Sequence, residues 1–460
     1  MIRTNTRIRP GRRPPTGHES HREPHGEPRL RSERIARPAP RVPALPLTRF
    51  LQVSAWLLCL APACLMAATF TANSTADLVD NNPGDGICAA NPDGDCTLRA
   101  AIMETNALGG EDTIELLAGT YTLSLVGNDD TALQGDLDIL GDLIIEGAGR
   151  DATVVDANQI DRVFHALAGV IISDLTIRNG RVDATTFQGG GILVDDITNC
   201  TLQRVRLADN MAEAGGAIRA FNGSMVTIED SLLTGNGLMV LGQTNTDGTA
   251  FFCRDCHLLL LGTTVSGNLG GDYAITVHDD TLTMQNSTVS GNAEGGVRVQ
   301  NADAVITFST LADNGSGVNL SYFSFEDSNF VQVSASILQN AAADNCAPGD
   351  LPVSAGYNVL DDASCALTAT GDLQNTSAQL GPLQDNGGPT PTHRPADSSP
   401  VVDAVPLSEC NTYQSLPLIA DQRGFGRPVG PACDSGAVEV VRDQVFSDGF
   451  EDALAIGSSG

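Results

Sequence analysis

The tripeptide His278-Asp279-Asp280 is the group of side chains in this chain best suited to acid–base chemistry. Removing a proton next to a carboxylate needs a base and a cation that neutralises that carboxylate. Hydrolysing a glycosidic bond needs two clustered carboxyl groups. However, Asp195-Asp196 falls at the same point of another repeat, where we expect a turn between strands. We therefore interpret His278, Asp279 and Asp280 first as turn residues and keep them as the catalytic candidates.

The remaining residues give little support to catalysis. Arg254 and Arg298 could neutralise a carboxylate, but neither has an identifiable partner base. The sequence contains no lysine, and its single tryptophan, Trp56, lies in the expected N-terminal leader, residues 1–67. Metal-ligand spacing is absent among the four histidines that follow the leader, which are His165, His257, His278 and His393. A non-catalytic role is the preferred interpretation, and a polysaccharide lyase or glycoside hydrolase is the alternative.

Two acidic loops offer oxygen ligands of the kind that Ca²⁺ prefers. They carry the candidate ligands Asp80, Asp85, Asp93 and Asp95. Neither loop matches an EF-hand or a nonapeptide Ca²⁺ repeat, and turn chemistry explains Asp, Asn and Gly equally well. We expect no cofactor and keep Ca²⁺ as the ligand that these loops would take.

Nine of the eleven cysteines follow the leader and suggest four close pairings. Sequence alone does not fix the connectivity, and Cys253-Arg-Asp-Cys256 has the alternatives of a redox pair or a metal half-site. Cys200 is left over. The expected disulfides are Cys88 with Cys96, Cys253 with Cys256, Cys346 with Cys365, and Cys410 with Cys433.

These residues lie in a repeat that is marked by asparagines 22 to 32 residues apart: Asn179, Asn210, Asn236, Asn268, Asn292, Asn314 and Asn340. Each unit holds short alternating strands such as Leu282-Thr-Met-Gln285. The fixed leucine spacing of leucine-rich repeats is missing, and a propeller blade needs longer units. The pattern therefore predicts a parallel β-helix whose asparagines occupy a fixed turn, tolerate left-handed backbone and bond their counterparts in the next coil.

The N-terminal region has the features of a secretion signal. Arg49 precedes an apolar stretch, 50–68, that ends in small residues and is short for a membrane span. Residues 1–49 carry 12 Arg and 4 Glu, so with a total charge of −30 the rest carries −38. Such a surface repels nucleic acid. We expect a secreted or surface-displayed protein with no membrane span once the signal is removed.

The segment Cys96-Thr-Leu-Arg-Ala-Ala-Ile102 opens an expected amphipathic helix that caps the open end of the solenoid. With Gly84-Asp-Gly-Ile-Cys88 it resembles the CSLREA domain, although Thr97 and Ala100 depart from that motif. Stretches from Leu380-Gly-Pro-Leu to Cys433-Asp-Ser-Gly-Ala-Val-Glu439 are similar to the choice-of-anchor Q domain. The resemblance implies an exported bacterial protein with a right-handed, pectin-lyase-like β-helix.

Five regions follow from this sequence. We expect an Arg/Pro-rich leader and signal at 1–67, a CSLREA-like cap at 68–111, a right-handed parallel β-helix at 112–345, a choice-of-anchor Q-like region at 346–440 and a flexible tail at 441–460. The expected function is a structural, adhesive or binding role. A glycan or a cell-surface protein is the expected partner.

Overall fold

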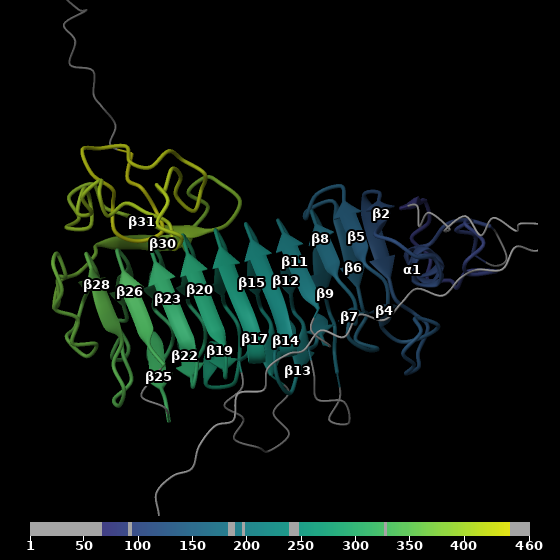
Figure 1. Cartoon of the computed structure of the whole chain (residues 1–460), viewed down its shortest axis with the longest axis horizontal. Coiled ribbons are helices and arrows are strands. Elements are labelled where there is room, and N and C mark those ends of the chain that lie inside the picture. Colours follow the sequence, from purple (N-terminus) through teal and green to yellow (C-terminus); the bar gives the residue numbers. More distant parts are fainter. Residues whose placement is uncertain are drawn as a thin grey trace, which may run out of the picture. The chain divides into compact units, whose positions relative to one another are not determined.

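The computed structural model describes residues 67–90, 94–182, 189–195, 198–238, 248–325 and 329–441. The expected signal up to residue 66, the Ca²⁺ candidate Asp93 and the tail from residue 442 lie outside these ranges. The described part folds as a right-handed parallel β-helix, as the sequence predicted, with strands stacked from coil to coil (Figure 1).

Each complete coil contributes three strands, which form three parallel rows. The first row is β4 (Leu137–Ile139), β7 (Phe164–Ala166), β10 (Ile192–Val194), β14 (Ile218–Glu229), β17 (Phe251–Leu261), β19 (Tyr273–His278), β22 (Gly295–Gln300) and β25 (Leu320–Phe323).

The second row shares the long strands β14 and β17, which run through both rows with a bulge between Phe221 and Ser224. Its other strands are β1 (Thr69–Ala72), β2 (Asp112–Leu116), β5 (Leu143–Gly147), β8 (Val170–Ser173), β11 (Asn199–Gln203), β20 (Thr281–Gln285), β23 (Asp303–Thr307), β26 (Val331–Ser334) and β28 (Val353–Gly356).

The third row is a separate ten-stranded sheet. It consists of β3 (Gly119–Thr122), β6 (Thr153–Asp156), β9 (Thr176–Arg178), β12 (Arg206–Ala208), β15 (Leu232–Thr234), β18 (Thr264–Ser266), β21 (Thr288–Ser290), β24 (Thr310–Ala312), β27 (Ile337–Gln339) and β29 (Val359–Leu360). Two short pairs complete the strands: β13 (Met211–Ala212) with β16 (Gly237–Leu238), and β30 (Leu380–Gln384) with β31 (Thr392–Pro395).

Strand alternation fills the interior with apolar side chains because every second residue points inward. One inward stack of the second row runs through eight coils in strict register and is buried throughout: Ile145, Ile172, Leu202, Ile228, Leu260, Met284, Ile306 and Val333. One coil cannot bury these side chains alone, so stacking stabilises the whole β-helix.

Buried asparagines connect the coils at one turn. The side-chain oxygens of Asn236, Asn268, Asn292 and Asn314 each accept from both the backbone amide and the Nδ2 group of the preceding asparagine, beginning at Asn210. The positive φ of this turn falls one residue earlier than we expected, at Asp209, Gly235, Gly267, Gly291 and Asp313. The ladder asparagines therefore serve as hydrogen-bonding groups and not as left-handed residues.

Both ends of the expected asparagine series differ from the prediction. Asn340 lies outside the ladder, which passes from Asn314 to Asn319 and then to Asn345. Asn179 does have a positive φ, but its Nδ2 group donates to the carboxylate of Asp156.

A second ladder, which was not predicted from the sequence, lies at the turn between the second and third rows. Backbone amides donate to hydroxyl oxygens one coil further on, from Val205 to Ser231 and so through the series. The hydroxyl groups belong to Ser231, Thr263, Ser287, Ser309 and Ser336, and the series ends at Asn358. In each of these coils the Ser or Thr directly follows a residue with positive φ. The recurring hydroxyl residue is the signal that the sequence offers.

The helix α1 (Leu98–Ala107) packs against β1, β2 and β4. Thr97, one of the two departures from the CSLREA motif, is its N-cap and accepts from the Ala100 amide. Arg99 is buried and pairs with Asp77 at 2.6 Å. Among the described residues, no helix is long and apolar enough to cross a membrane.

The C-terminal segment folds back along the third row of strands (Figure 1). Gln422 bridges Thr264 and Thr288 by side-chain hydrogen bonds. The buried ion pairs Arg423–Asp421 (2.7 Å) and Arg427–Glu439 (3.1 Å) hold this segment together.

The structure joins the cysteines as Cys88–Cys96, Cys253–Cys256, Cys346–Cys365 and Cys410–Cys433, the four pairs that the spacing suggested. Cys200 is buried and unpaired, and burial raises the pKa of its thiol to about 12.

Replacing Asn268 with alanine should destabilise the β-helix strongly. The change leaves the amide and the Nδ2 group of Asn236 without their acceptor in the interior, and each such loss costs about 1–3 kcal/mol. We expect the free energy of unfolding, measured with denaturant, to fall by about 2–5 kcal/mol. Asn222→Gly is the control, because Asn222 is exposed and its positive φ suits glycine. Equal losses in the two variants would contradict the ladder's role.

His393 should make the stability of the fold depend on pH. Its Nδ1 group donates to the Gly381 carbonyl (2.7 Å), so Nε2 accepts from the Ser290 hydroxyl (2.7 Å) and the buried ring is neutral. Burial lowers the pKa of His393, so the stabilisation is present above the unfolded pKa of about 6.5 and is lost as pH falls through the folded pKa.

The measurement is the urea midpoint at about pH 7 and about pH 5. We expect a larger decrease for the wild type than for His393→Gln, whose side chain does not titrate in this range. The same decrease in both proteins would show that His393 protonation does not contribute.

Candidate functional site

The outward-facing side chains of the first row gather arginine and aromatic residues on adjacent coils. Arg219 of β14 is in register with Phe252 of β17, followed by Thr276 of β19 and Arg298 of β22. The residues that alternate with them, such as Phe251 and Cys253, belong to the buried core. Strand alternation therefore points this first line of side chains away from the core, with Arg219 and Arg298 partly exposed and Phe252 and Thr276 buried.

A second line runs parallel to the first, two residues further along each strand. Phe221, Arg254, His278, Gln300 and Phe323 occupy equivalent positions on five adjacent coils. Neighbouring strands lie about 4.8 Å apart, so this line extends for about 19 Å. We call the two lines together the arginine–aromatic face. Its members are Arg219, Phe252, Thr276, Arg298, Phe221, Arg254, His278, Gln300 and Phe323.

Phe252 is the centre of the contacts on this face. The guanidinium carbons of Arg219 and Arg254 lie 5.2 and 5.9 Å from the centre of its ring, and the His278 ring lies 5.5 Å from it. Arg298 lies 5.7 Å from the ring of Tyr273. Cation–π attraction of this kind is strongest where the groups are desolvated, and Phe252 is only 1% exposed. The arginines are therefore held in place by rings.

His278 has an uncharged imidazole at neutral pH. Burial, together with the positive charges of Arg298 and Arg254, lowers the pKa of His278 to about 4, while Asp279 opposes the shift. Its Nε2 atom is buried and has no hydrogen-bond partner within the described residues. A neutral imidazole between two guanidinium groups has a free lone pair and could accept a proton.

The three catalytic candidates do not converge on one point. His278 packs on Phe252 of the preceding coil, whereas Asp280 pairs with His257 at 3.1 Å. Asp279 is exposed and has a positive φ, as do Asn222, Asp255 and Asn301 at the same turn of neighbouring coils. Asp279 thus lies in a turn, and Asp280 follows it. His278 instead lies near Arg254 and Arg298.

The disulfide Cys253–Cys256 closes the turn that carries Arg254 and Asp255. Both cysteines are fully buried beneath this turn. Because their sulfurs are joined to each other, neither is present as a thiolate for metal binding or redox chemistry in this state. The disulfide instead restrains the backbone next to Arg254.

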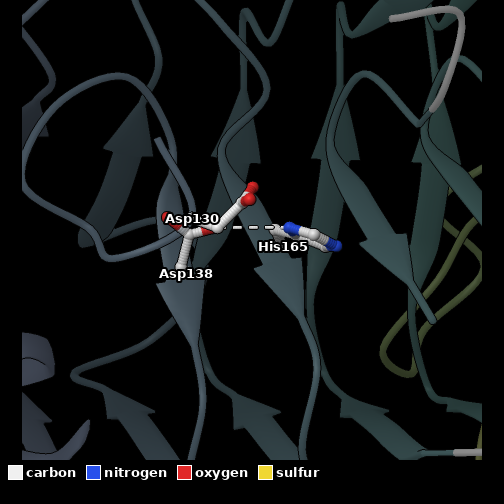
Figure 2. Close-up of side chains that lie close together, drawn as sticks. All are labelled: Asp130, Asp138 and His165. Atoms are coloured by element: carbon white, nitrogen blue, oxygen red, sulfur yellow. Dashed lines mark hydrogen bonds and ion pairs between the residues drawn. The ribbon is translucent and has the colours of Figure 1, made fainter. Parts of the chain in front are cut away.

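Three metal-ligating side chains meet near the N-terminal end of the first row. Asp138 of β4 and His165 of β7 are register partners on adjacent coils, and Oδ1 of Asp138 lies 3.1 Å from Nδ1 of His165. Asp130, from the loop before β4, lies beside this pair (Figure 2). One ligand atom from each residue lies within 4.8 Å of the others. This cluster was not predicted from the sequence, in which His165 stands far from the other histidines.

The electrostatics around Asp138 are dominated by acids. Arg162 pairs with Asp136 at 2.9 Å and lies 3.9 Å from Asp161. Burial raises the pKa of Asp136 to about 7, and Arg162 partly opposes the shift.

Two of the carboxylates proposed for Ca²⁺, Asp80 and Asp85, bind backbone amides of their own loop. Asp80 accepts from the amides of Asn82 and Ala89, and Asp85 accepts from the Ile87 amide. Asp95 is exposed, and its carbonyl accepts from the Ala90 amide. The Asp80 and Asp85 side chains therefore serve as turn caps, and Ca²⁺ binding by Asp80, Asp85 and Asp95 stays a prediction.

Residues 162–341 match the family described as the right-handed β-helix region. No curated protein matches the chain in sequence. The crystal structure of pectate lyase Pel9A is similar at 13% identity, covering 82% of this chain and 97% of that chain with a TM-score of 0.44. The A-module of mannuronan C-5 epimerase AlgE4 from Azotobacter vinelandii is similar at 14% identity, covering 63% and 94% with a TM-score of 0.30.

The pKa of His278 can be tested directly by following its Cε1–H resonance with pH. We expect a midpoint near 4, and Arg298→Gln should raise it because one neighbouring positive charge is removed. Arg204→Gln removes a charge elsewhere, where Arg204 pairs with Asp174, and should leave the midpoint unchanged. A wild-type midpoint near the ordinary 6.5 would contradict the buried, cation-flanked position of the ring.

Proposed function

We propose that this chain is an exported β-helix protein that binds an anionic glycan along the arginine–aromatic face. The observation that carries the proposal is that two arginines on this face, Arg254 and Arg298, have no carboxylate partner. Eight arginines form ion pairs with carboxylates: Arg99, Arg162, Arg178, Arg204, Arg206, Arg394, Arg423 and Arg427. Arg254 and Arg298, which lie on this face, form no ion pair with any described residue, and elsewhere the same holds for Arg150 and Arg181.

Arginines without carboxylate partners suit ligands that bring their own carboxylates. A guanidinium group binds a carboxylate by paired, charge-assisted hydrogen bonds. The rings beneath Arg254 and Arg298 support these side chains without neutralising their charge. An acidic sugar polymer, whose charges repeat along its length, fits a line of sites that repeats along the coils.

Aromatic residues at the end of the face add an apolar surface for sugar rings. Phe323 is 41% and Phe325 73% exposed, and their rings meet edge to face at 4.6 Å. An aromatic ring offers a large apolar area, and exposed apolar clusters commonly mark binding sites.

Export is supported by the four disulfides, which persist in oxidising compartments. The assignments of the 68–111 region to a CSLREA domain and of the 346–440 region to a choice-of-anchor Q domain belong to the same proposal, as does the signal before residue 68. With these assignments, the proposal locates the β-helix at the cell surface or in the medium. There a glycan is the accessible partner, and a cell-surface protein is the other.

A second candidate function is a polysaccharide lyase. The neutral His278 between Arg254 and Arg298 favours it, because the arginines could neutralise a uronate carboxylate while the imidazole removes the adjacent proton. The leaving oxygen would take up a proton, and an unsaturated sugar would remain. In this candidate His278 takes the role of base, and Asp279 and Asp280 take no part.

Binding to polygalacturonate or alginate, measured in EDTA by biolayer interferometry, tests the proposal. Arg254→Gln and Arg298→Gln should each weaken binding about tenfold or more, because a hydrogen bond to a charged group contributes about 1.5–3 kcal/mol. Phe323→Ala should weaken it less. A neutral glucan should not bind.

Arg204→Gln is the matched control, since it changes the net charge equally but lies at a turn paired with Asp174. Equal weakening in this control would show diffuse electrostatics and contradict the proposed face. Unsaturated products that disappear in His278→Gln would select the lyase, and binding without products would select the adhesive or binding role.

A further inference from the structure

The cluster of Asp130, Asp138 and His165 has the composition of a metal site and lies outside the contacts described for the arginine–aromatic face. Asp138 is fully buried, and its Oδ2 atom accepts from the Ala132 amide while Oδ1 faces Nδ1 of His165. The His165 side chain is 14% exposed. The pair is thus a fixed imidazole–carboxylate unit with one accessible side.

Asp130 supplies the third ligand group from that accessible side (Figure 2). Within the described residues, no donor forms a hydrogen bond or an ion pair with its carboxylate. Without a cation, an exposed carboxylate such as Asp130 is not stabilised by approaching the Asp138 carboxylate, because the two negative charges repel. Its position within 4.8 Å of both Asp138 and His165 is instead what a shared cation would require.

The loop that carries Asp130 is held in place independently of any ion. The Asp129 carboxylate accepts from the amides of Thr131, Leu133 and Gln134. From the helix α1, Arg99 donates to the carbonyls of Ala132, Gly135 and Asp136. The ligand group is therefore preorganised, which lowers the entropic cost of binding.

We propose that Asp130, Asp138 and His165 together bind one divalent transition-metal ion of the Zn²⁺ class. One imidazole nitrogen and two carboxylate oxygens suit Zn²⁺, whereas Ca²⁺ takes six to eight oxygen ligands. Ligand atoms around tetrahedral Zn²⁺ lie roughly 3.4 Å apart, so a small movement of the exposed Asp130 side chain completes the site.

Three protein ligands leave a fourth position open for water or an incoming oxygen. His165 is in register with Leu193 and, one coil further, with Arg219. The ion therefore lies in line with the arginine–aromatic face, and a ligand carboxylate could take the open position. Metal binding itself does not depend on the proposed glycan function.

Calorimetric titration of the tag-free, EDTA-treated full chain with ZnCl₂, and with CaCl₂ for comparison, tests the site. We expect His165→Gln and Asp130→Asn each to bind one Zn²⁺ fewer than wild type, or to bind it at least about tenfold more weakly. Even mutation of residues that only contact the ligands lowers metal affinity by about that factor. Asp130 is exposed, so its variant should fold normally, as circular dichroism will check. Co²⁺ should give a visible absorption band that the same two variants lose.

His257→Gln is the matched control, because His257 pairs with Asp280 at the same 3.1 Å, and no third ligand joins that pair among the described residues. It should bind Zn²⁺ as the wild type does. The inference is overturned if wild type binds no Zn²⁺, or if His165→Gln and Asp130→Asn retain full binding. Because no glycan is present, either result leaves the test of the arginine–aromatic face unaffected.

Discussion

In-register stacking of one coil on the next is the constraint on which the rest of this structure depends. Each strand pairs in parallel with its counterparts one coil before and one coil after, so the position of a residue in its own coil decides which side chains it meets. A slip by one residue would turn the inward Ile228 and Leu260 outward. The same slip would separate Arg219 from Phe252 and Asp138 from His165. The same strand register therefore determines both the packing of the core and the contacts within the candidate sites.

Two ladders of buried polar groups at the turns preserve this register. Parallel strands alone leave the turn amides unpaired, and an unpaired buried amide is costly. The asparagine ladder satisfies amides at one turn and the serine–threonine ladder at another. Because both ladders fix the turns, coils can differ in length elsewhere without loss of alignment. This explains how units of 22 to 32 residues coexist in one regular stack.

The fold could be predicted from the sequence because its signals repeat, whereas the sites could not because they occur once. Asparagine spacing indicated the coils, but it did not distinguish Asn340 from Asn319, which lies in the same unit and continues the ladder. Asp138 and His165 are 27 residues apart, one coil, yet they precede the asparagine series and could not be aligned. The grouping of Arg254 with His278 required the exact strand register.

A cationic face on a strongly acidic chain is physically consistent. At physiological ionic strength charges are screened beyond about 8 Å. The −38 carried by the residues after position 49 therefore acts weakly at the face, while Arg254 and Arg298 act at contact distance. The buried Phe252 ring and the half-buried Tyr273 ring beneath them reduce local screening further and favour a bound carboxylate. The surrounding acids would then repel polyanions that approach anywhere else. For the proposed glycan, net charge would thus favour this face over the acidic surface around it instead of excluding binding.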